Sequence, residues 1–255
     1  MELQLNPFKA RLAAGERLIG FWSMLCSPMA IDIVRDSGYD WLLIDTEHSP
    51  NEPPGVLAQL QAATGGTASA IVRPAWNDPV IIKRLLDLGT QTLLIPYVQN
   101  AEEAKKAVAA CTYPPHGIRG VAGGSRASRY GRQKDYLKRA SEVVSVLVQV
   151  ETGEALKELE AIAAVPGIDG VFIGPSDLAA SLGHVGNAQH PEVQAALKDA
   201  VTRLKAVGKP AGILTPNEDE AKRYIEWGYQ FVAVGIDTTM LGRHADALLQ
   251  RFKAG

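Results

Sequence analysis

The chain has 255 residues, a formal net charge of −2 and 46% hydrophobic residues, values typical of a soluble globular protein. Neither charge sign dominates, so nucleic acid and anionic membranes are not expected as partners. The two cysteines, Cys26 and Cys111, fit no metal or redox spacing and exclude a disulfide scaffold. No signal pattern and no apolar run of membrane-span length is present, so we expect a cytoplasmic protein.

Short apolar runs alternate with helical patterns along the chain. Strands are predicted at 18–24, 41–44, 68–72, 92–96, 144–151, 170–173, 210–214 and 231–235. Helices are predicted at 6–12, 28–37, 56–63, 79–88, 101–111, 154–164, 191–207, 217–227 and 237–252. Eight strand–helix units without a linker favour a single (β/α)8 TIM barrel spanning 1–255, with an N-terminal helix. A doubly wound sheet would normally carry a glycine-rich turn after the first strand, and 24–27 is not one.

The segment 144–151 is the most informative stretch. Its apolar, mostly β-branched residues are typical of a parallel strand buried on both faces, and it ends in Gln149 and Glu151. Residues two apart in a strand point to the same face, so both polar side chains project together. Burying a carboxylate is costly unless a positive group meets it, and we hypothesise that a divalent metal ion does so here.

Other predicted strands also end in polar residues. Active sites of (β/α)8 barrels form at the C-terminal ends of the strands, which converge on one rim. Besides Gln149 and Glu151, the strand ends carry Asp45, Glu47, His48, Arg73, Ser176 and Asp177. The opposite rim shows no comparable set, so these residues form the candidate active site.

Each of these residues also has a plain structural interpretation. Glu151 and Asp177 could be acids that satisfy free N–H groups at helix N-termini. His48 could be a structural histidine, and Arg73 could simply pair with an acid of the second strand. If the two carboxylates bind a metal, oxygen ligands suit a hard cation such as Mg²⁺ or Mn²⁺, with Co²⁺, Ni²⁺ or Zn²⁺ as further candidates.

The connection 113–133 is rich in glycine, arginine and serine and has no clear periodicity, so it could close over the site or lie at a subunit interface. Its basic residues, Arg126, Arg129 and Arg132, are interpreted as a solvated face in preference to an anion site. The histidines outside the strand ends are interpreted as surface residues: His116, His184, His190 and His244.

The lysines argue against covalent amine catalysis. A Schiff-base aldolase needs a lysine facing the barrel mouth. Lys209 precedes its strand and so belongs at the base, and the other lysines fall on helices, in the long connection or at the termini. A metal that polarises a carbonyl is therefore expected to do that work.

Several segments resemble a known family. They are Leu43-Ile44-Asp45-Thr46-Glu47-His48-Ser49, Val72-Arg73-Pro74, Gly89-Thr90-Gln91-Thr92-Leu93-Leu94-Ile95-Pro96, Gly117-Ile118-Arg119-Gly120, Gln149-Val150-Glu151-Thr152 and Gly174-Pro175-Ser176-Asp177-Leu178. In this order and spacing the chain resembles the HpcH/HpaI family of class II pyruvate aldolases, from about residue 6 to the last helix. The resemblance implies reversible cleavage of 4-hydroxy-2-oxo acids to pyruvate, or a related 2-oxo acid, and an aldehyde through a metal-stabilised enolate.

The resemblance also implies roles for individual residues. Glu151 and Asp177 would bind the metal, and the 2-oxo acid would be held by the metal, Gln149 and the Ser176 backbone, although the family often has alanine at position 176. Arg73 would steady the enolate oxygen. His48 would be the general base, and Asp87 would raise its basicity, a role that rests on the resemblance alone.

Other functions and the oligomeric state remain open. A related metal-dependent barrel lyase could act on an acyl-CoA thioester or a phosphoenolpyruvate-type substrate, and a non-catalytic barrel could simply bind 2-oxo acids. The family tends to form homohexamers through C-terminal helices. In this chain the apolar residues of that helix are expected to face their own barrel: Leu241, Leu248, Leu249 and Phe252.

Overall fold

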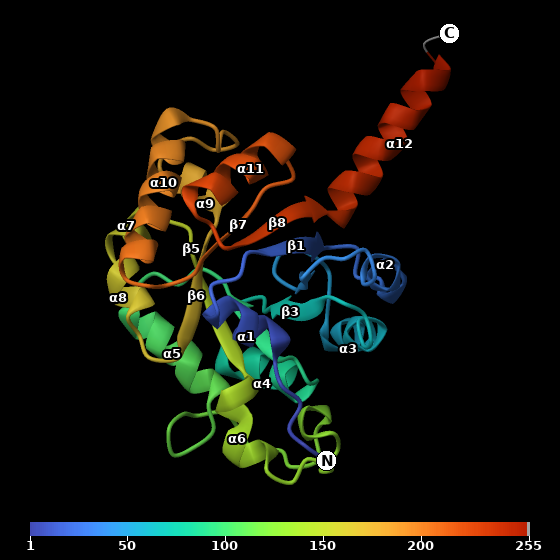
Figure 1. Ribbon diagram of the computed structural model, residues 1–255, viewed down its shortest axis with the longest axis vertical. Coiled ribbons are helices and arrows are strands. Elements are labelled where there is room, and N and C mark those ends of the chain that lie inside the picture. The colour runs from blue at the N-terminus through green and yellow to red at the C-terminus, as the bar shows by residue number, and fades with distance from the viewer. Residues whose placement is uncertain (254–255) are drawn as a thin grey trace.

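The computed structural model describes residues 1–253 and shows a closed barrel of eight parallel strands in the order β1 to β8 (Figure 1). The barrel closes because β1 pairs with both β2 and β8. This confirms the predicted (β/α)8 architecture. The strands are β1 (Leu18–Ser23), β2 (Trp41–Asp45), β3 (Ser69–Arg73), β4 (Thr92–Ile95), β5 (Ser145–Val150), β6 (Ile168–Ile173), β7 (Ala211–Leu214) and β8 (Phe231–Ile236).

Helices surround the strands, and none of those in residues 1–253 is long and apolar enough to cross a membrane. Several begin with a proline preceded by an Asn, Ser or Asp cap, a combination that favours helix initiation. The helices are α1 (Pro7–Ala13), α2 (Pro28–Val34), α3 (Pro53–Ala62), α4 (Pro79–Asp87), α5 (Ala101–Cys111), the 3-10 turn η1 (Arg126–Ser128), α6 (Tyr136–Val143), α7 (Gly153–Lys157), α8 (Leu159–Ala163), α9 (Pro175–Ser181), α10 (Pro191–Ala206), α11 (Glu218–Trp227) and α12 (Asp237–Lys253).

The strands bury both faces. In β5, Val146, Val148 and Val150 pack in the layer between strands and helices, whereas Leu147 packs in the cluster inside the barrel. This alternation follows from the two-residue period of a strand. It fixes which residues of each strand point into the barrel, and therefore which side chains can reach its mouth.

Helix α1 closes the base of the barrel. Phe8 is buried there and packs edge-on against the rings of Trp41 and Phe231, at centroid distances of 6.2 and 6.0 Å. Gly20 makes room for this aromatic layer, because a Cβ atom at that position would lie 2.0 Å from the Trp41 ring. The base of the barrel is therefore filled, and the site described below lies at the opposite, C-terminal end of the strands.

The helices differ from the sequence prediction in three places. Helix α6 lies in a region without a predicted helix, although its buried residues Tyr136, Ala140 and Val143 have helical spacing. Helix α9 follows β6 where only a polar stretch was expected. The predicted helix 154–164 is divided at Glu158, whose ψ of 9° interrupts the helix between α7 and α8.

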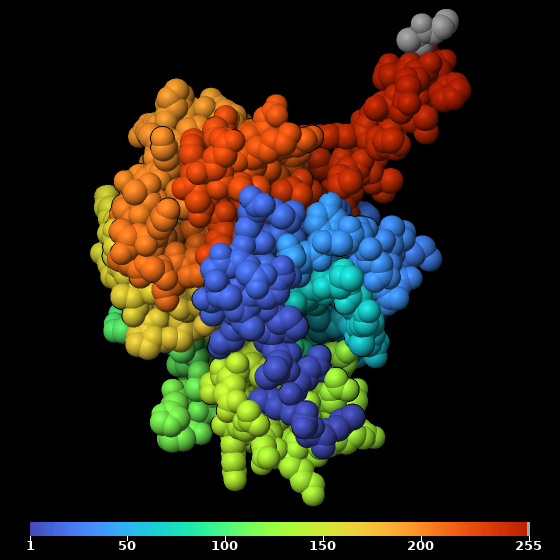
Figure 2. Space-filling view, in the orientation of Figure 1, coloured from blue at the N-terminus to red at the C-terminus, as the bar shows by residue number. Residues whose placement is uncertain are grey.

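The C-terminal helix corrects a further expectation. Helix α12 extends away from the barrel, and in the space-filling view most of its length stands clear of the other elements (Figure 2). The apolar residues expected to face their own barrel are instead exposed, Leu241 by 61% and Phe252 by 80%. The reason is geometric, since the helix leaves β8 pointing outward and contacts mainly β1 and β8 near its start.

Candidate active site

In three strands, the side chains that point into the barrel are apolar in the middle of the strand and polar at its C-terminal end. Leu43, Ile71 and Leu147 pack inside the barrel. Two residues later the same faces carry Asp45 on β2, Arg73 on β3 and Gln149 on β5, and all three are buried. Glu151 follows Gln149 by two more residues. The alternation of the strands therefore gathers these groups at one end of the barrel.

Arg73 lies at the centre of this polar group. Its Nε and Nη2 bind both carboxylate oxygens of Asp45, at 2.8 and 2.6 Å, in a bidentate pair. Its Nη1 lies 2.8 Å from Oε2 of Glu47. The guanidinium also lies over the Trp22 ring, 4.8 Å from the ring centroid. Arg73 therefore does pair with the acids at the end of the second strand. These pairs hold its guanidinium at the mouth of the barrel.

Asp45 is ionised in this arrangement. Burial alone would raise its pKa, but the hydrogen bonds and the positive charge of Arg73 outweigh burial and hold the pKa below its ordinary value. Trp22 adds a hydrogen bond from Nε1 to Oδ2 at 3.2 Å. Asp45 is therefore a fixed anion that orients Arg73.

Glu151 has the opposite electrostatic character. Its Oε1 accepts a hydrogen bond from the Tyr97 backbone N at 2.8 Å, and its Oε2 accepts one from Nε2 of Gln149 at 3.0 Å. Burial, together with the nearby charges of Glu47 and Asp177, raises the pKa of Glu151 to about 7. Ionised Glu151 therefore needs an additional positive charge at this position.

Glu47 adds to this need. Its pKa is raised, first by burial, against the opposing charges of Arg73 and His48. Its Oε2 is ion-paired with Nη1 of Arg73 at 2.8 Å, but it accepts no well-aligned hydrogen bond among residues 1–253. The charge of Glu47 is therefore only partly compensated within the described chain.

The carboxylates fit a divalent cation. Oxygen donors from acidic side chains suit Mg²⁺ or Mn²⁺. Burial, and after it the neighbouring acids, raise the pKa values of Glu47 and Glu151, so a cation beside them would favour their ionised forms. Gly174, just after β6, leaves space for this site, since a Cβ atom there would lie 2.4 Å from Oε2 of Glu151. The donor set and the space beside it are therefore compatible with the predicted metal.

Gln149 connects the two halves of the site. Its Oε1 accepts a hydrogen bond from Nη1 of Arg73 at 3.3 Å, while its Nε2 donates to Glu151. The side chain is buried, and both ends of its amide are occupied within the protein. Gln149 therefore orients Arg73 and Glu151 relative to each other, and its predicted contact with substrate stays a prediction.

Three predicted site residues lie on the exposed rim. Ser176 and Asp177 are exposed in the first turn of α9, and the His48 side chain is 58% exposed, 4.0 Å from Glu47. Asp177 is the acid of the first turn of α9, whose N-cap is Gly174, so the helix N-terminal interpretation of this acid stays open. The negative charge of Asp177 also contributes to the raised pKa of Glu151, which places its carboxylate close to that residue.

Asp87 is not brought to His48 within this chain. It is the last residue of α4, which runs back toward the base of the barrel, and its carboxylate pairs with Arg119 at 2.9 Å. His48 follows β2 at the opposite end of the barrel. The structure therefore gives no contact through which Asp87 would raise the basicity of His48 in the same chain.

Lys209 lies at the base, as its position before β7 predicted. Its Nζ donates to the carbonyl oxygen of Ile168 at 2.6 Å, at the start of β6. This lysine cannot reach the polar group at the opposite end of the barrel. Its position is consistent with chemistry that does not use a Schiff base.

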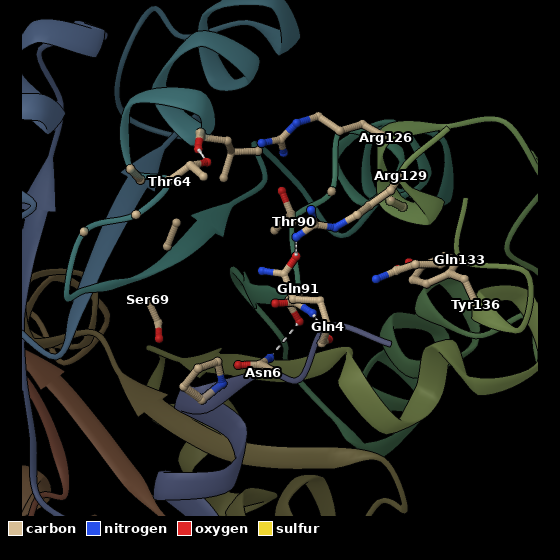
Figure 3. Close-up of a pocket in the computed structure, with 18 of the residues that line it drawn as sticks. Gln4, Asn6, Thr64, Ser69, Thr90, Gln91, Arg126, Arg129, Gln133 and Tyr136 are labelled. Atoms are coloured by element: carbon tan, nitrogen blue, oxygen red, sulfur yellow. Dashed lines mark hydrogen bonds between the residues drawn. The ribbon is translucent and has the colours of Figure 1, made fainter. Parts of the chain in front are cut away.

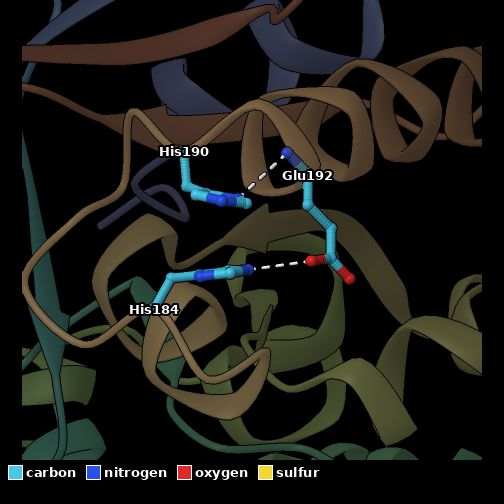
Figure 4. Close-up of side chains that lie close together, drawn as sticks. All are labelled: His184, His190 and Glu192. Carbon is cyan, nitrogen blue, oxygen red and sulfur yellow. Dashed lines mark hydrogen bonds and ion pairs between the residues drawn. The ribbon is translucent and has the colours of Figure 1, made fainter.

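A second group of potential metal ligands lies in the loop between α9 and α10 and in the first turn of α10. Ligand atoms of His184, His190 and Glu192 lie within 4.8 Å of one another (Figure 4). His184 Nε2 is 2.8 Å from Glu192, and His190 caps α10 by accepting from the Glu192 backbone N. The two imidazole rings stack at 3.4 Å, so their in-plane lone pairs run side by side and do not converge on one point. These contacts favour the predicted surface role.

Sequence reasoning did not assign roles to Tyr97, Trp22 or Gly174. The Tyr97 contribution is a backbone N–H, held toward Glu151 by a left-handed backbone with φ of 55°, and no side-chain pattern reveals it. Trp22 is on β1, two strands from Arg73 on β3, and its sequence context predicts only a strand residue. A signal for Gly174 existed, since glycine directly follows a buried strand at the active end.

Comparisons with known proteins agree with this architecture. The family model for "HpcH/HpaI aldolase/citrate lyase" matches residues 18–244. A pyruvate aldolase of Rhizobium etli is 57% identical over 99% of each chain. A 4-hydroxy-2-oxo-heptane-1,7-dioate aldolase of Klebsiella pneumoniae is 57% identical over 97% of this chain and 94% of its own. The crystal structure of a family member from Burkholderia cenocepacia superposes with a TM-score of 0.94, at 40% identity over 97% of this chain and 99% of that one.

The barrel with its acidic mouth thus defines a (β/α)8 enzyme of the carbon–carbon lyase class. The chain belongs to the HpcH/HpaI aldolase/citrate lyase family. This confirms the family resemblance and the prediction that the protein is an aldolase.

Proposed function

We propose that this aldolase reversibly cleaves 4-hydroxy-2-oxo acids into pyruvate, or a related 2-oxo acid, and an aldehyde. The observation that carries the proposal is the connected group Arg73, Gln149 and Glu151 at the barrel mouth, in which a buried carboxylate short of positive charge lies beside a fixed guanidinium. The names of the two 57% identical relatives, a pyruvate aldolase and a 4-hydroxy-2-oxo-heptane-1,7-dioate aldolase, support the same substrate class.

Glu151 and Asp177 would hold a divalent cation, Mg²⁺ or Mn²⁺ by the hardness of their oxygens. When bound, such a cation would withdraw electron density from a coordinated 2-oxo acid and so ease loss of the neighbouring proton. The negative charge of Glu47 also contributes to the raised pKa of Glu151 and so favours a cation beside it. Metal dependence is therefore part of the proposal.

Arg73 would stabilise the oxygen on which negative charge develops. Its hydrogen bonds to Asp45 and Gln149 use three of its five N–H groups and hold the guanidinium in one orientation. The remaining N–H groups can donate to a substrate oxygen without a rearrangement, which is the requirement for electrostatic stabilisation of a transition state.

His48 would move the proton at the aldehyde side. It lies on the exposed rim, where an aldehyde or its hydroxyl group enters from solvent. The backbone of Ser176, at the start of α9, would position the 2-oxo acid together with Gln149. These roles place the proton-transfer group outside and the charge-stabilising groups inside the mouth.

We further propose that the protein is a homo-oligomer, a hexamer by its family resemblance, assembled through α12. One side of α12 exposes a stripe of Leu241, Leu248, Leu249 and Phe252. The helix stands clear of its own barrel (Figure 2). A contiguous apolar face on a projecting helix is unfavourable in water and is typical of a protein–protein interface. A second copy of the chain would bury it.

The direct test is deuterium exchange of the pyruvate methyl protons in D₂O, followed by NMR. Exchange that requires protein and Mg²⁺ or Mn²⁺, and that stops with a chelator, would support the proposal without knowledge of the aldehyde. Glu151→Gln and Asp177→Asn should abolish it. Glu160→Gln, which changes a half-buried acid on α8 that pairs with Arg203, should not. Exchange unaffected by the chelator would refute the metal role, and no exchange at all would remove pyruvate as the donor and direct attention to acyl-CoA thioesters.

A further inference from the structure

A cavity of about 600 Å³ lies at the base of the barrel, away from the active site. Its walls come from segments that precede strands: the start of the chain, residues 63–70 before and within β3, and residues 89–91 before β4. The loop that carries η1 closes the remaining side (Figure 3). Because α1 and its aromatic layer fill the barrel above, this cavity has no path to the mouth through the barrel interior.

The cavity is strongly basic. Arg126, Arg129 and Arg132 line it, and no Asp or Glu is among the lining residues of the described chain. None of the three has a carboxylate within 4.0 Å among residues 1–253. A fourth lining arginine, Arg11, differs because it is paired with Glu16 and Asp40, at 2.7 and 2.8 Å.

The partners of the loop arginines are neutral. Arg126 donates from Nη1 to the carbonyl oxygen of Leu88 at 2.7 Å, and Arg129 donates from Nη2 to Oε1 of Gln4 at 2.6 Å. These bonds aim the guanidinium groups without compensating their charge. Figure 3 shows both side chains reaching from the loop toward the middle of the cavity. Concentrated positive charge without an internal counter-ion favours binding of an anion.

Thr90 provides an independent observation. Its side chain lines the cavity and is 98% buried by the protein, since only 2% of the residue is exposed. Its Oγ1 has no hydrogen-bond partner among residues 1–253. A buried hydroxyl without a partner is uncommon in a native structure, and this one belongs to a residue in the wall of a cavity. Thr90 lies beside the ends of Arg126 and Arg129 (Figure 3).

We propose that this cavity binds a small polar metabolite through an oxyanion, phosphate or carboxylate. Arg126 and Arg129 supply planar donors that match either group, and the unpaired hydroxyl of Thr90 lies in the wall behind them. The volume falls within the usual range for metabolite sites, and amides and hydroxyls such as Gln4 and Gln91 complete the wall. The solvated-face interpretation of the basic loop leaves the cavity and the unpaired Thr90 unexplained. The proposal stands apart from the pyruvate chemistry at the mouth.

The test is isothermal titration of the purified protein with inorganic phosphate and, separately, with succinate, at constant ionic strength. Arg129→Gln and Thr90→Val should each weaken saturable binding at least tenfold. Arg84→Gln is the matched control, since it removes an exposed arginine of α4 outside the cavity. Arg73→Gln controls for binding at the mouth and should leave this binding in place. Pyruvate proton exchange and circular dichroism on Arg129→Gln, Thr90→Val and Arg84→Gln establish that the barrel is intact.

The outcomes separate the possibilities. Binding of phosphate but not succinate, or the reverse, would identify which oxyanion the site prefers, and either result supports the proposal. Absence of saturable binding by both anions would overturn it. Equal losses in Arg84→Gln and Arg129→Gln would also overturn it, because they would show a general charge effect. Loss in Arg73→Gln alone would assign the anion to the active site instead.

Discussion

Gly174 lies directly against Glu151, and a Cβ atom on Gly174 would be 2.4 Å from the carboxylate oxygen Oε2. We predict that Gly174→Ala displaces Glu151 and weakens Mn²⁺ binding at least tenfold, with a similar loss of pyruvate proton exchange. The cause is steric, since the backbone of Gly174 has a negative φ that alanine can adopt. Mn²⁺ affinity can be measured by electron paramagnetic resonance of the free ion.

The control for that variant is Gly124→Ala. Gly124 lies in the loop after α5, and a Cβ atom added there would have no other atom within 4 Å. Its φ is not positive, so alanine can adopt the same backbone conformation. It should bind Mn²⁺ as the unmodified protein does. If Gly174→Ala also retained full affinity, Glu151 would not be a ligand in its present position.

The bidentate pair between Arg73 and Asp45 leads to a second prediction. Asp45→Asn leaves a buried guanidinium without its main counter-charge, and breaking a buried pair costs about 3–5 kcal/mol. Glu47 remains beside Arg73 and still compensates part of its charge. We therefore expect the free energy of unfolding to fall by an amount near the lower end of this range. Exchange of pyruvate protons should fall by about 10²-fold, the effect of misplacing one stabilising donor.

Urea unfolding with Glu160→Gln provides the comparison. Glu160 also forms a bidentate pair, with Arg203, but its side chain is 45% exposed. Exposed pairs contribute about 0–1 kcal/mol, so this variant should unfold almost as the unmodified protein does and exchange pyruvate protons normally. Equal destabilisation by the two substitutions would show that burial of Asp45 is not what matters.

The pKa of Glu151 predicts a pH dependence for metal binding. Burial and the neighbouring acids raise this pKa to about 7, and a protonated carboxyl group does not bind a divalent cation. The affinity for Mn²⁺ should therefore rise about tenfold per unit as the pH increases toward 7, and level off above it. Titration calorimetry at several pH values measures this. A flat profile between pH 5.5 and 7.5 would contradict the prediction.

Without metal the same group should act on stability in the opposite direction. The unfolded chain ionises Glu151 near its ordinary pKa of 4.5, whereas the folded protein holds the proton up to about 7. The folded state binds more protons in this window, so the free energy of unfolding should decrease as pH rises through it, by at most about 3 kcal/mol. Glu151→Gln should remove this decrease, which urea unfolding in the presence of a chelator can measure.

The sequence allowed much of this site to be predicted because a strand has a period of two. Once Leu147 is inside the barrel, Gln149 and Glu151 must follow it inward, and Arg73 follows Ile71 by the same rule. What could not be predicted are contacts made by the backbone. The N–H of Tyr97 reaches Glu151 only because its φ is 55°, a conformation that no residue pattern near Tyr97 indicates.

Helix direction explains the position of Asp87. A helix between parallel strands runs antiparallel to them, so its last residues return to the base of the barrel. This rule already separated Asp87 from His48 within one chain, and the ion pair with Arg119 shows where the carboxylate is used. Helix α12 has no following strand to return to, and local sequence therefore could not fix its direction.

The exposed stripe of α12 gives the last prediction. Leu248→Glu places a charge in the middle of the apolar face formed with Leu241 and Phe252, and burying that charge between copies would be strongly unfavourable. We expect the variant to sediment as a smaller species than the unmodified protein in analytical ultracentrifugation, with its barrel intact by circular dichroism. Gln250→Glu adds the same charge on the opposite side of the helix, about 180° away at 100° per residue, and should leave the assembly unchanged. If both variants sedimented as the unmodified protein does, the stripe would not be the contact between copies, and the outward direction of α12 would need another cause.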